Sequence, residues 1–269
     1  VSAAWGFAFV VMKDAIERQT PNNFLFSRFV LAVVVMLLIR PQCIKYFNKD
    51  LLLRGSAAGL FLGGGYILQT LGLKSTESAA LTGFITGLYV VFTPLIAAVV
   101  LRVRITLFTW VCVGIATIGL GLLSIKGWEI GDGELLVLAS AFAFGAHIIA
   151  LGKWSSGRDV YAMTVVQLAM CALLSGIASI PEGYSAPPDT GVWAVVIFTA
   201  VVCTAVAFVV QTWSQAHMTT TKVAVILTME VVFAAVFAMI FGGERLTLQA
   251  TIGGMLVLLS MFIIVLKSS

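Results

Sequence analysis

The sequence is poor in charged residues. Only 10% of its 269 residues are Asp, Glu, Lys or Arg, whereas 60% are hydrophobic and the mean hydropathy is +1.07. A water-soluble domain of this size needs far more polar surface than these residues supply, so a soluble fold is excluded. The composition therefore predicts an integral membrane protein.

Motifs of enzymes and ATP-driven pumps are also missing. The sequence contains no HExxH, no GxSxG and no paired intramembrane Asp, which argues against an intramembrane enzyme. It contains no GxxxxGK[ST] phosphate loop, which argues against ATP as the energy source. We expect neither an enzymatic activity nor a cofactor.

Cysteines are few and scattered. They stand at Cys43, Cys112, Cys171 and Cys203, without a CxxC pair. This spacing suggests neither a disulfide framework nor a zinc site. We expect the four to be small apolar packing residues, and we expect no metal.

Long uncharged windows fill most of the chain. They run over Gly55–Leu73, Ser78–Leu101, Ile105–Ile125, Leu135–Gly152, Val160–Pro181, Thr190–Thr221 and Leu246–Leu266. A spanning helix needs about 20 apolar residues, and three further candidates that carry charges cover about residues 1–19, 22–40 and 220–242. Continuous apolar runs such as Val30–Ile39 favour helices over the alternating strands of a β-barrel. The sequence thus predicts an all-α integral membrane protein with ten transmembrane helices.

The basic residues indicate an orientation. The densest cluster is Arg40, Lys45, Lys49 and Arg54, which we assign to the cytoplasmic side. This assignment puts both termini in the cytoplasm, and it accounts for the net charge of +4 without a nucleic-acid partner. Because the chain starts without Met and inside an apolar stretch, we also expect residues before Val1.

The chain repeats itself. Tyr66-Ile67-Leu68-Gln69-Thr70 recurs as Phe208-Val209-Val210-Gln211-Thr212, and shorter echoes follow the same pattern. These are Arg104-Ile105-Thr106 with Arg245-Leu246-Thr247, and Phe7-Ala8-Phe9 with Phe142-Ala143-Phe144. We predict two repeats, residues 1–127 and 128–269, of five helices each. An odd helix number inverts the second repeat, which favours a central cavity with alternating access.

Polar and aromatic residues inside the predicted helices are the candidate binding residues, because intramembrane polar groups are costly. They are Trp5, Tyr66, Gln69, Tyr89, His147, Gln211, Trp213 and Glu230. Gln69 and Gln211 are related by the repeat, so we expect them at equal depth, binding substrate or joining helices. The aromatic rings could form a binding wall.

Charged and titratable residues in the helices leave alternatives open. Glu230, opposite Tyr89 by the repeat, could bind a substrate ammonium, carry a coupling proton, or pair with Lys222 or Arg28. His147 could couple protons or be a satisfied core residue. Arg28 lies close to a helix end, so we expect its long side chain to reach the membrane surface.

Several short motifs resemble the EamA-type repeat of the drug/metabolite transporter superfamily. They are Ala4-Trp5-Gly6 with Phe9 and Lys13, then Pro21, Phe24 and Arg28-Phe29, then Gly243-Glu244-Arg245-Leu246-Thr247 and Gly253-Gly254. The sequence is most similar to the YddG-type bacterial exporters of amino acids and aromatic metabolites. One departure is Arg102-Val103-Arg104, where the repeat usually carries Gly-Glu-Arg.

The resemblance implies a multi-pass transporter of the bacterial inner membrane. Its expected function is export of small amphipathic metabolites, above all neutral and aromatic amino acids. Alternatives are a multidrug or quaternary-amine carrier, or a nucleotide-sugar-like carrier, although phosphate needs cations and only Arg28 and Lys222 could serve. A channel would need a continuous polar lining, and the few polar residues here are spread over several helices, which argues against a channel. The expected partners are a small-molecule substrate and the lipid bilayer.

Overall fold

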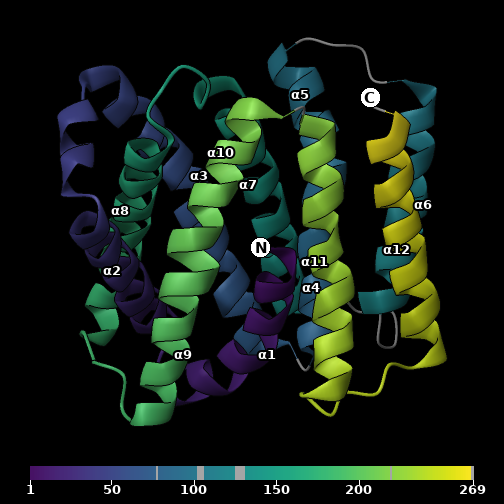
Figure 1. The fold of residues 1–269 in the computed structure, drawn as a ribbon. Coiled ribbons are helices and arrows are strands. Elements are labelled where there is room, and N and C mark those ends of the chain that lie inside the picture. Colours follow the sequence, from purple (N-terminus) through teal and green to yellow (C-terminus); the bar gives the residue numbers. More distant parts are fainter. Residues whose placement is uncertain (77, 102–105, 125–130, 219, 268–269) are drawn as a thin grey trace.

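The computed structural model describes residues 1–76, 78–101, 106–124, 131–218 and 220–267 (Figure 1). The motif Arg102-Val103-Arg104 lies outside these ranges. Everything regular in the described part is helical. The α-helices are α1 (Ser2–Arg18), α2 (Pro21–Ile39), α3 (Lys49–Ser75), α4 (Ala79–Gly87), α5 (Tyr89–Leu101), α6 (Leu107–Ser124), α7 (Asp132–Trp154), α8 (Val160–Ser179), α9 (Thr190–Ala200), α10 (Ala207–His217), α11 (Thr220–Ile240) and α12 (Leu248–Lys267). Short 3₁₀ turns are η1 (Pro41–Tyr46) and η2 (Ile180–Glu182), and η3 (Val201–Val206) is π-helical.

Polar capping residues mark where the apolar helices begin. Asn48, Ser78, Asp159 and Asp189 each accept, through the side chain, a hydrogen bond of 2.8–3.0 Å from the backbone N–H three residues later. Such caps satisfy donors that a helix start leaves without a partner. At Asp189 the backbone hydrogen bond lowers the pKa of the carboxyl, so this cap is charged at neutral pH.

In the part of the chain that the structure describes, six segments are long and apolar enough to cross a membrane. They are Pro21–Ile39, Lys49–Ser75, Ala79–Val100, Asp132–Trp154, Val160–Glu182 and Thr190–His217. Shorter apolar helical stretches cover Trp110–Gly119, Met229–Ile240 and Leu248–Ile263. These segments agree with the all-α membrane class that the composition predicts.

Two of the six segments are irregular in the middle. Between α4 and α5 the chain tightens at Leu88, whose N–H donates to the Ile85 carbonyl (3.1 Å). The irregular turn therefore lies just before Tyr89, the first residue of α5, and Pro94 lies inside α5. The π-helical segment η3 joins α9 to α10. Such π-helical turns are rare and occur often at functional sites.

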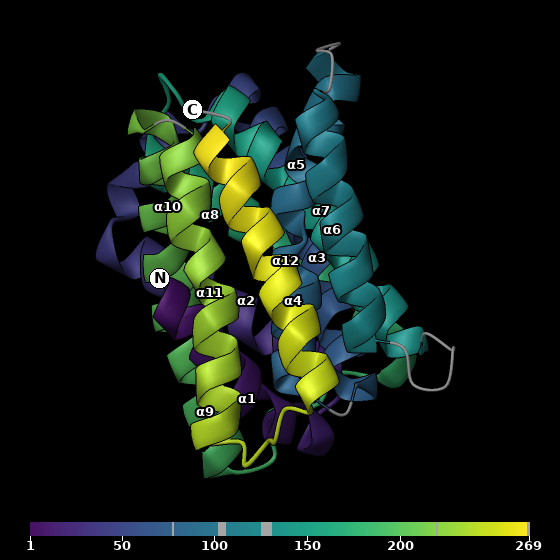
Figure 2. The same cartoon turned by 90° about the vertical axis from the view of Figure 1, so that its right-hand side faces the viewer.

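Helix α3 is central to the bundle. It packs against α7 and α8, which come from the second half of the sequence, and α1 packs in the same way against α11. Helices α6 and α12 lie side by side at one edge, and α2 and α8 lie side by side at the opposite edge (Figures 1 and 2). The two halves of the sequence therefore interleave rather than form separate lobes.

Glycines allow α3 to approach its neighbours closely. A Cβ placed at Gly59 would stand 2.6 Å from the Gln167 carbonyl oxygen on α8, and one at Gly63 would stand 2.8 Å from Leu174. A Cβ at Gly65 would meet the ring of Phe144 on α7, also at 2.6 Å, whereas Gly64 faces open space. Close helix contact at glycines is common in membrane bundles. Gly63 and Gly65 therefore allow α8 and α7 to lie close to α3.

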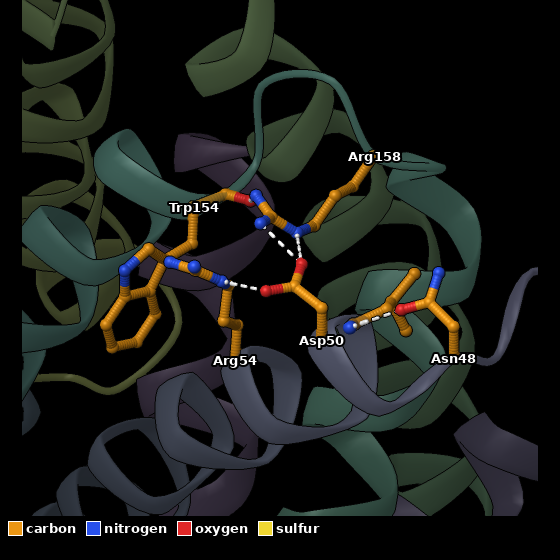
Figure 3. A network of polar contacts seen from close by, with 6 residues as sticks. Asn48, Asp50, Arg54, Trp154 and Arg158 are labelled. Carbon is orange, nitrogen blue, oxygen red and sulfur yellow. Dashed lines mark hydrogen bonds and ion pairs between the residues drawn. The ribbon is translucent and has the colours of Figure 1, made fainter.

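Ion pairs join the two halves at the end of the bundle that carries η1. Arg158, in the turn between α7 and α8, donates through Nε (2.7 Å) to Asp50 on α3, which also accepts from Arg54 (2.6 Å) (Figure 3). The next residue, Asp159, accepts from Arg40 at 2.9 Å. Arg158 and Asp159, which are adjacent in the turn between α7 and α8, thus pair with Asp50 and Arg40 of the first half of the sequence.

Charge reversal should test this network. Asp50→Arg places a third cation beside Arg54 and Arg158, so we expect a melting temperature lower by a few degrees in detergent. The change is small because these groups are partly exposed, and exposed pairs contribute about 1 kcal/mol or less. Adding Arg158→Asp should restore most of the loss. A double variant no more stable than Asp50→Arg would show that this contact does not join the halves.

Candidate functional site

A cavity lies inside the bundle among α1, α3, α4, α5, α7, α10 and α11. It holds about 410 Å³ of empty space, including the part open to the outside. Its lining consists of Trp5, Leu62, Tyr66, Gln69, Thr86, Tyr89, Phe144, His147, Ile148, Phe208, Gln211, Leu227 and Glu230. The wall is mostly apolar, with a few polar groups from widely separated parts of the sequence.

Most of the predicted binding residues meet at this cavity. Trp5, Tyr66, Gln69, Tyr89, His147, Gln211 and Glu230 all line it. Trp213 does not: its side chain is 52% exposed and its ring stacks on His217 at 4.9 Å between centroids. Trp213 follows Gln211 by two residues, which is about 200° around a helix, so its ring points away from the cavity that Gln211 lines.

The paired glutamines are both buried and make different bonds. Gln69 is 6% exposed and Gln211 is 4% exposed. The Gln69 amide donates to the Thr86 hydroxyl (3.1 Å), which ties α3 to α4. The Gln211 amide is 3.4 Å from Gln215, and its own carbonyl oxygen has no partner among the residues described. Gln69 therefore joins helices, whereas Gln211 keeps an acceptor at the cavity wall.

Aromatic rings enclose the cavity around Tyr66. Its ring makes edge contacts with Phe144 and Phe208, at 5.4 and 6.1 Å between centroids. Phe208 also packs on Trp5 at 5.4 Å. Neither Phe144 nor Phe208 was among the predicted residues. The repeat held the signal for both, because it pairs Phe208 with Tyr66 and Phe144 with Phe9.

The π-helical segment η3 supplies two hydrogen-bond acceptors to residues beside the cavity. The Trp5 indole N–H donates to the Cys203 carbonyl at 2.7 Å. The Arg28 Nε donates to the Thr204 hydroxyl, also at 2.7 Å. The first acceptor is a backbone carbonyl of the π-helical segment and the second is a side-chain hydroxyl, and no sequence pattern predicted this segment.

Arg28 is the main correction to the expected site. Its side chain does not reach the membrane surface, because α2 turns this face inward and leaves the residue 1% exposed. The guanidinium carbon lies 4.8 Å from the centre of the Tyr66 ring. It lines a second cavity of about 240 Å³ with Trp5, Ala8, Phe9, Met12, Tyr66, Gln69 and Glu230. Because four of these residues also line the larger cavity, the two spaces are neighbouring chambers of one site.

Glu230 stands between the two chambers. Its side chain lines both and is only 7% exposed. Among the residues described, no hydrogen bond and no ion pair reaches its carboxylate, so the pair with Arg28 considered above is not formed. The side chain of Lys222 lies outside the described part. Glu230 faces the cavity as an acid without a described partner.

Comparison with known proteins identifies the family. The sequence model of the EamA-like transporter family matches residues 1–125 and again 132–266. The chain belongs to the EamA-like transporter family. It is 32% identical over 268 residues to an uncharacterized transporter of Archaeoglobus fulgidus, an alignment that covers 99% of this chain and 84% of that protein. A crystal structure of another protein shares the fold, with a TM-score of 0.69 at 16% identity over 97% of this chain and 93% of that one.

Membership in the family settles the broad class. Proteins of the EamA-like family are transporters, so this chain is a multi-pass membrane transporter and not an enzyme. Such a transporter binds a small-molecule substrate within the lipid bilayer. The cavity inside the bundle of this EamA-family protein is the place where such a molecule could bind.

Two other polar residues of the cavity differ in their bonding. The His147 Nε2 donates to the Gln167 side-chain oxygen at 2.8 Å, so this histidine has a partner on α8. The Tyr89 hydroxyl has no partner within the described ranges. Of the two, Tyr89 is the better placed to donate a hydrogen bond to a bound molecule. The cysteines Cys43, Cys112, Cys171 and Cys203 are buried, as expected of packing residues.

Glu244 of the EamA-family Gly-Glu-Arg motif caps a helix of the other half. It follows α11 and accepts hydrogen bonds from the Ser78 hydroxyl (2.5 Å), the Ala79 N–H (2.7 Å) and the Ala80 N–H (3.4 Å). These groups form the N-terminus of α4, where a carboxylate is favourable. Since Thr86 on α4 lines the cavity, Glu244 holds one wall in place.

Removal of this cap should destabilise the protein. Glu244→Ala loses three hydrogen bonds at a helix N-terminus, so we expect the free energy of unfolding to fall by about 1–2 kcal/mol. Thermal denaturation of the purified protein measures the change. The control is Glu182→Ala, which removes an exposed acid from η2. Equal melting temperatures for the two variants would contradict the structural role of Glu244.

Proposed function

We propose that this EamA-family protein is a secondary transporter that exports small amphipathic metabolites, above all neutral and aromatic amino acids. One observation carries the proposal: positions related by the internal repeat line one cavity from both halves. These are Gln69 with Gln211, Tyr66 with Phe208, and Tyr89 with Glu230. In transporters built from repeats, the substrate site lies at such an interface.

The proposed topology is ten transmembrane segments in two inverted five-helix repeats, residues 1–127 and 128–269. In it, α4 with α5 forms one segment, and α9, η3 and α10 form another. The two separate family matches, at 1–125 and 132–266, support the division. Alternating access would result when one half moves against the other around the cavity. We assign the basic end at Arg40–Arg54, and both termini, to the cytoplasmic side of a bacterial inner membrane.

The cavity wall supports an amphipathic substrate. Apolar surface comes from Leu62, Phe144, Phe208 and Leu227. Because the cavity has few polar groups, it requires few specific hydrogen bonds of a substrate. A second candidate is an organic cation such as a quaternary amine. It is favoured by an acid, Glu230, among aromatic rings, which attract cations through their faces.

Uptake into proteoliposomes tests the proposal. The purified protein is reconstituted, and entry of radiolabelled phenylalanine is measured against empty liposomes. Unlabelled alanine, leucine, tryptophan and tetraethylammonium serve as competitors. Saturable uptake inhibited by the amino acids supports the proposal. Uptake of a labelled quaternary amine without any uptake of amino acids would replace it with the second candidate.

A further inference from the structure

We propose that the two chambers form one bipolar site, in which Arg28 binds a carboxylate and Glu230 binds an ammonium group of the same ligand. The ligand class is a zwitterion with an apolar side chain, held with its charged end in the smaller chamber. This inference rests on the proposed function, since it names how an amino acid would be recognised.

Arg28 has donors to spare. A guanidinium carries five N–H donors. Nε is used by Thr204, and Nη1 lies 3.5 Å from the sulfur of Met12, a weak acceptor. Nη2 has no partner in the part of the chain that the structure describes. A carboxylate is the group that a guanidinium fork binds best, through two parallel hydrogen bonds.

Glu230 is an acidic residue at the same chamber as the basic Arg28. It lines the smaller chamber together with Arg28, and Trp5, Tyr66 and Gln69 complete the wall between them and the larger chamber. A buried charge without a partner is strongly unfavourable. The Arg28 and Glu230 side chains are both more than nine-tenths buried, and no ion pair joins them in the described part of the chain. A ligand group of opposite charge would therefore stabilise the charged form of each side chain.

A zwitterion compensates both charges at once. An amine would satisfy Glu230 and leave Arg28 without a counter-charge, and an acid would do the reverse. Selectivity of this kind arises because a ligand that lacks one charged group leaves a desolvated side chain without a partner, and this lowers its affinity. The larger chamber, lined by Leu62, Phe144, Phe208 and Leu227, then receives the apolar side chain.

The experiment compares phenylalanine with two analogues that each lack one charged group. Phenethylamine lacks the carboxylate, and 3-phenylpropionate lacks the ammonium. Inhibition of labelled phenylalanine uptake is measured for unlabelled phenylalanine and for both analogues. With the unaltered protein, we expect half-inhibition by phenylalanine at a concentration at least tenfold lower than by either analogue.

Variants then assign each pole. Ligand-induced shifts of the melting temperature report binding without turnover. In Arg28→Gln the preference for phenylalanine over phenethylamine should fall to near one, while the preference over 3-phenylpropionate persists. Glu230→Gln should show the mirror pattern. Arg28→Lys keeps the charge and should retain part of the selectivity, and Arg54→Gln, at the bundle end, should leave it unchanged.

The outcomes separate the two proposals. If phenylalanine is taken up but the analogues inhibit as well as phenylalanine does, the bipolar site is wrong and amino-acid transport stands. Equal loss of all three ligands in folded Arg28→Gln also overturns the assignment of the carboxylate. If the unaltered protein takes up no amino acid, the proposed function fails, and the bipolar site fails with it. The test on the unaltered protein decides even where a variant does not fold.

Discussion

Glu230→Gln is expected to lower phenylalanine uptake by about thirtyfold or more while leaving the amount of folded protein unchanged. Gln has nearly the same size as Glu, so the packing of α11 is kept and only the charge is lost. Truncating one partner of a desolvated charge pair costs about 2 kcal/mol or more, which corresponds to that factor. Glu230 is a good position for this change because no described residue depends on it for a hydrogen bond.

The measurement is the initial uptake rate into proteoliposomes with equal amounts of reconstituted protein. Glu182→Gln, an exposed acid far from the cavity lining, is the matched control and should transport normally. Rates are recorded over a range of pH values. A profile that flattens in Glu230→Gln would indicate that the carboxyl also carries a proton. Unchanged uptake would remove Glu230 from the transport mechanism.

Gly59→Ala should destabilise the protein by about 2–3 kcal/mol. The added methyl group would stand 2.6 Å from the Gln167 carbonyl oxygen and 2.7 Å from the Met170 Cβ. Both are parts of α8 that lie at or next to the backbone, so the methyl cannot be accommodated by a side-chain rotation. The helices must separate, and overpacking of this kind costs about 1–3 kcal/mol. The contact of α3 with α8 would loosen along its length.

A matched control lies five residues further along the same helix. Gly64 faces open space, so Gly64→Ala meets no neighbour and should be neutral, or stabilising by up to about 1 kcal/mol through helix propensity. Thermal denaturation in one detergent compares both variants with the unaltered protein. If Gly59→Ala melts no lower than Gly64→Ala, close packing at Gly59 does not stabilise the bundle.

The sequence predicted the site best where the repeat supplied two observations of one position. Gln69 and Gln211 meet at the cavity because equivalent positions in paired units share a depth and a facing. The same logic placed Glu230 opposite Tyr89, and both line the cavity. Composition and apolar windows sufficed for the membrane class, because a water-soluble protein of this size needs more charged and polar residues than the sequence has.

Residues without a repeat partner were harder to place. Trp213 was included as an aromatic candidate for the binding wall, but its side chain is exposed. Arg28 was expected at the surface from its distance to the helix end, yet burial depends on which side α2 turns to its neighbours. A single sequence gives depth along a helix more readily than rotation about its axis. The π-helical segment has no composition signal at all.

The π-helical segment η3 changes how α10 is rotated about its axis relative to α9. A π-helical turn accommodates one extra residue, and one residue corresponds to about 100° of rotation in an α-helix. The apolar face that α9 presents to its surroundings and the face of α10 that carries Phe208 and Gln211 can therefore be set independently. One residue of added length, rather than any particular side chain, gives this continuous helical segment two separate orientations.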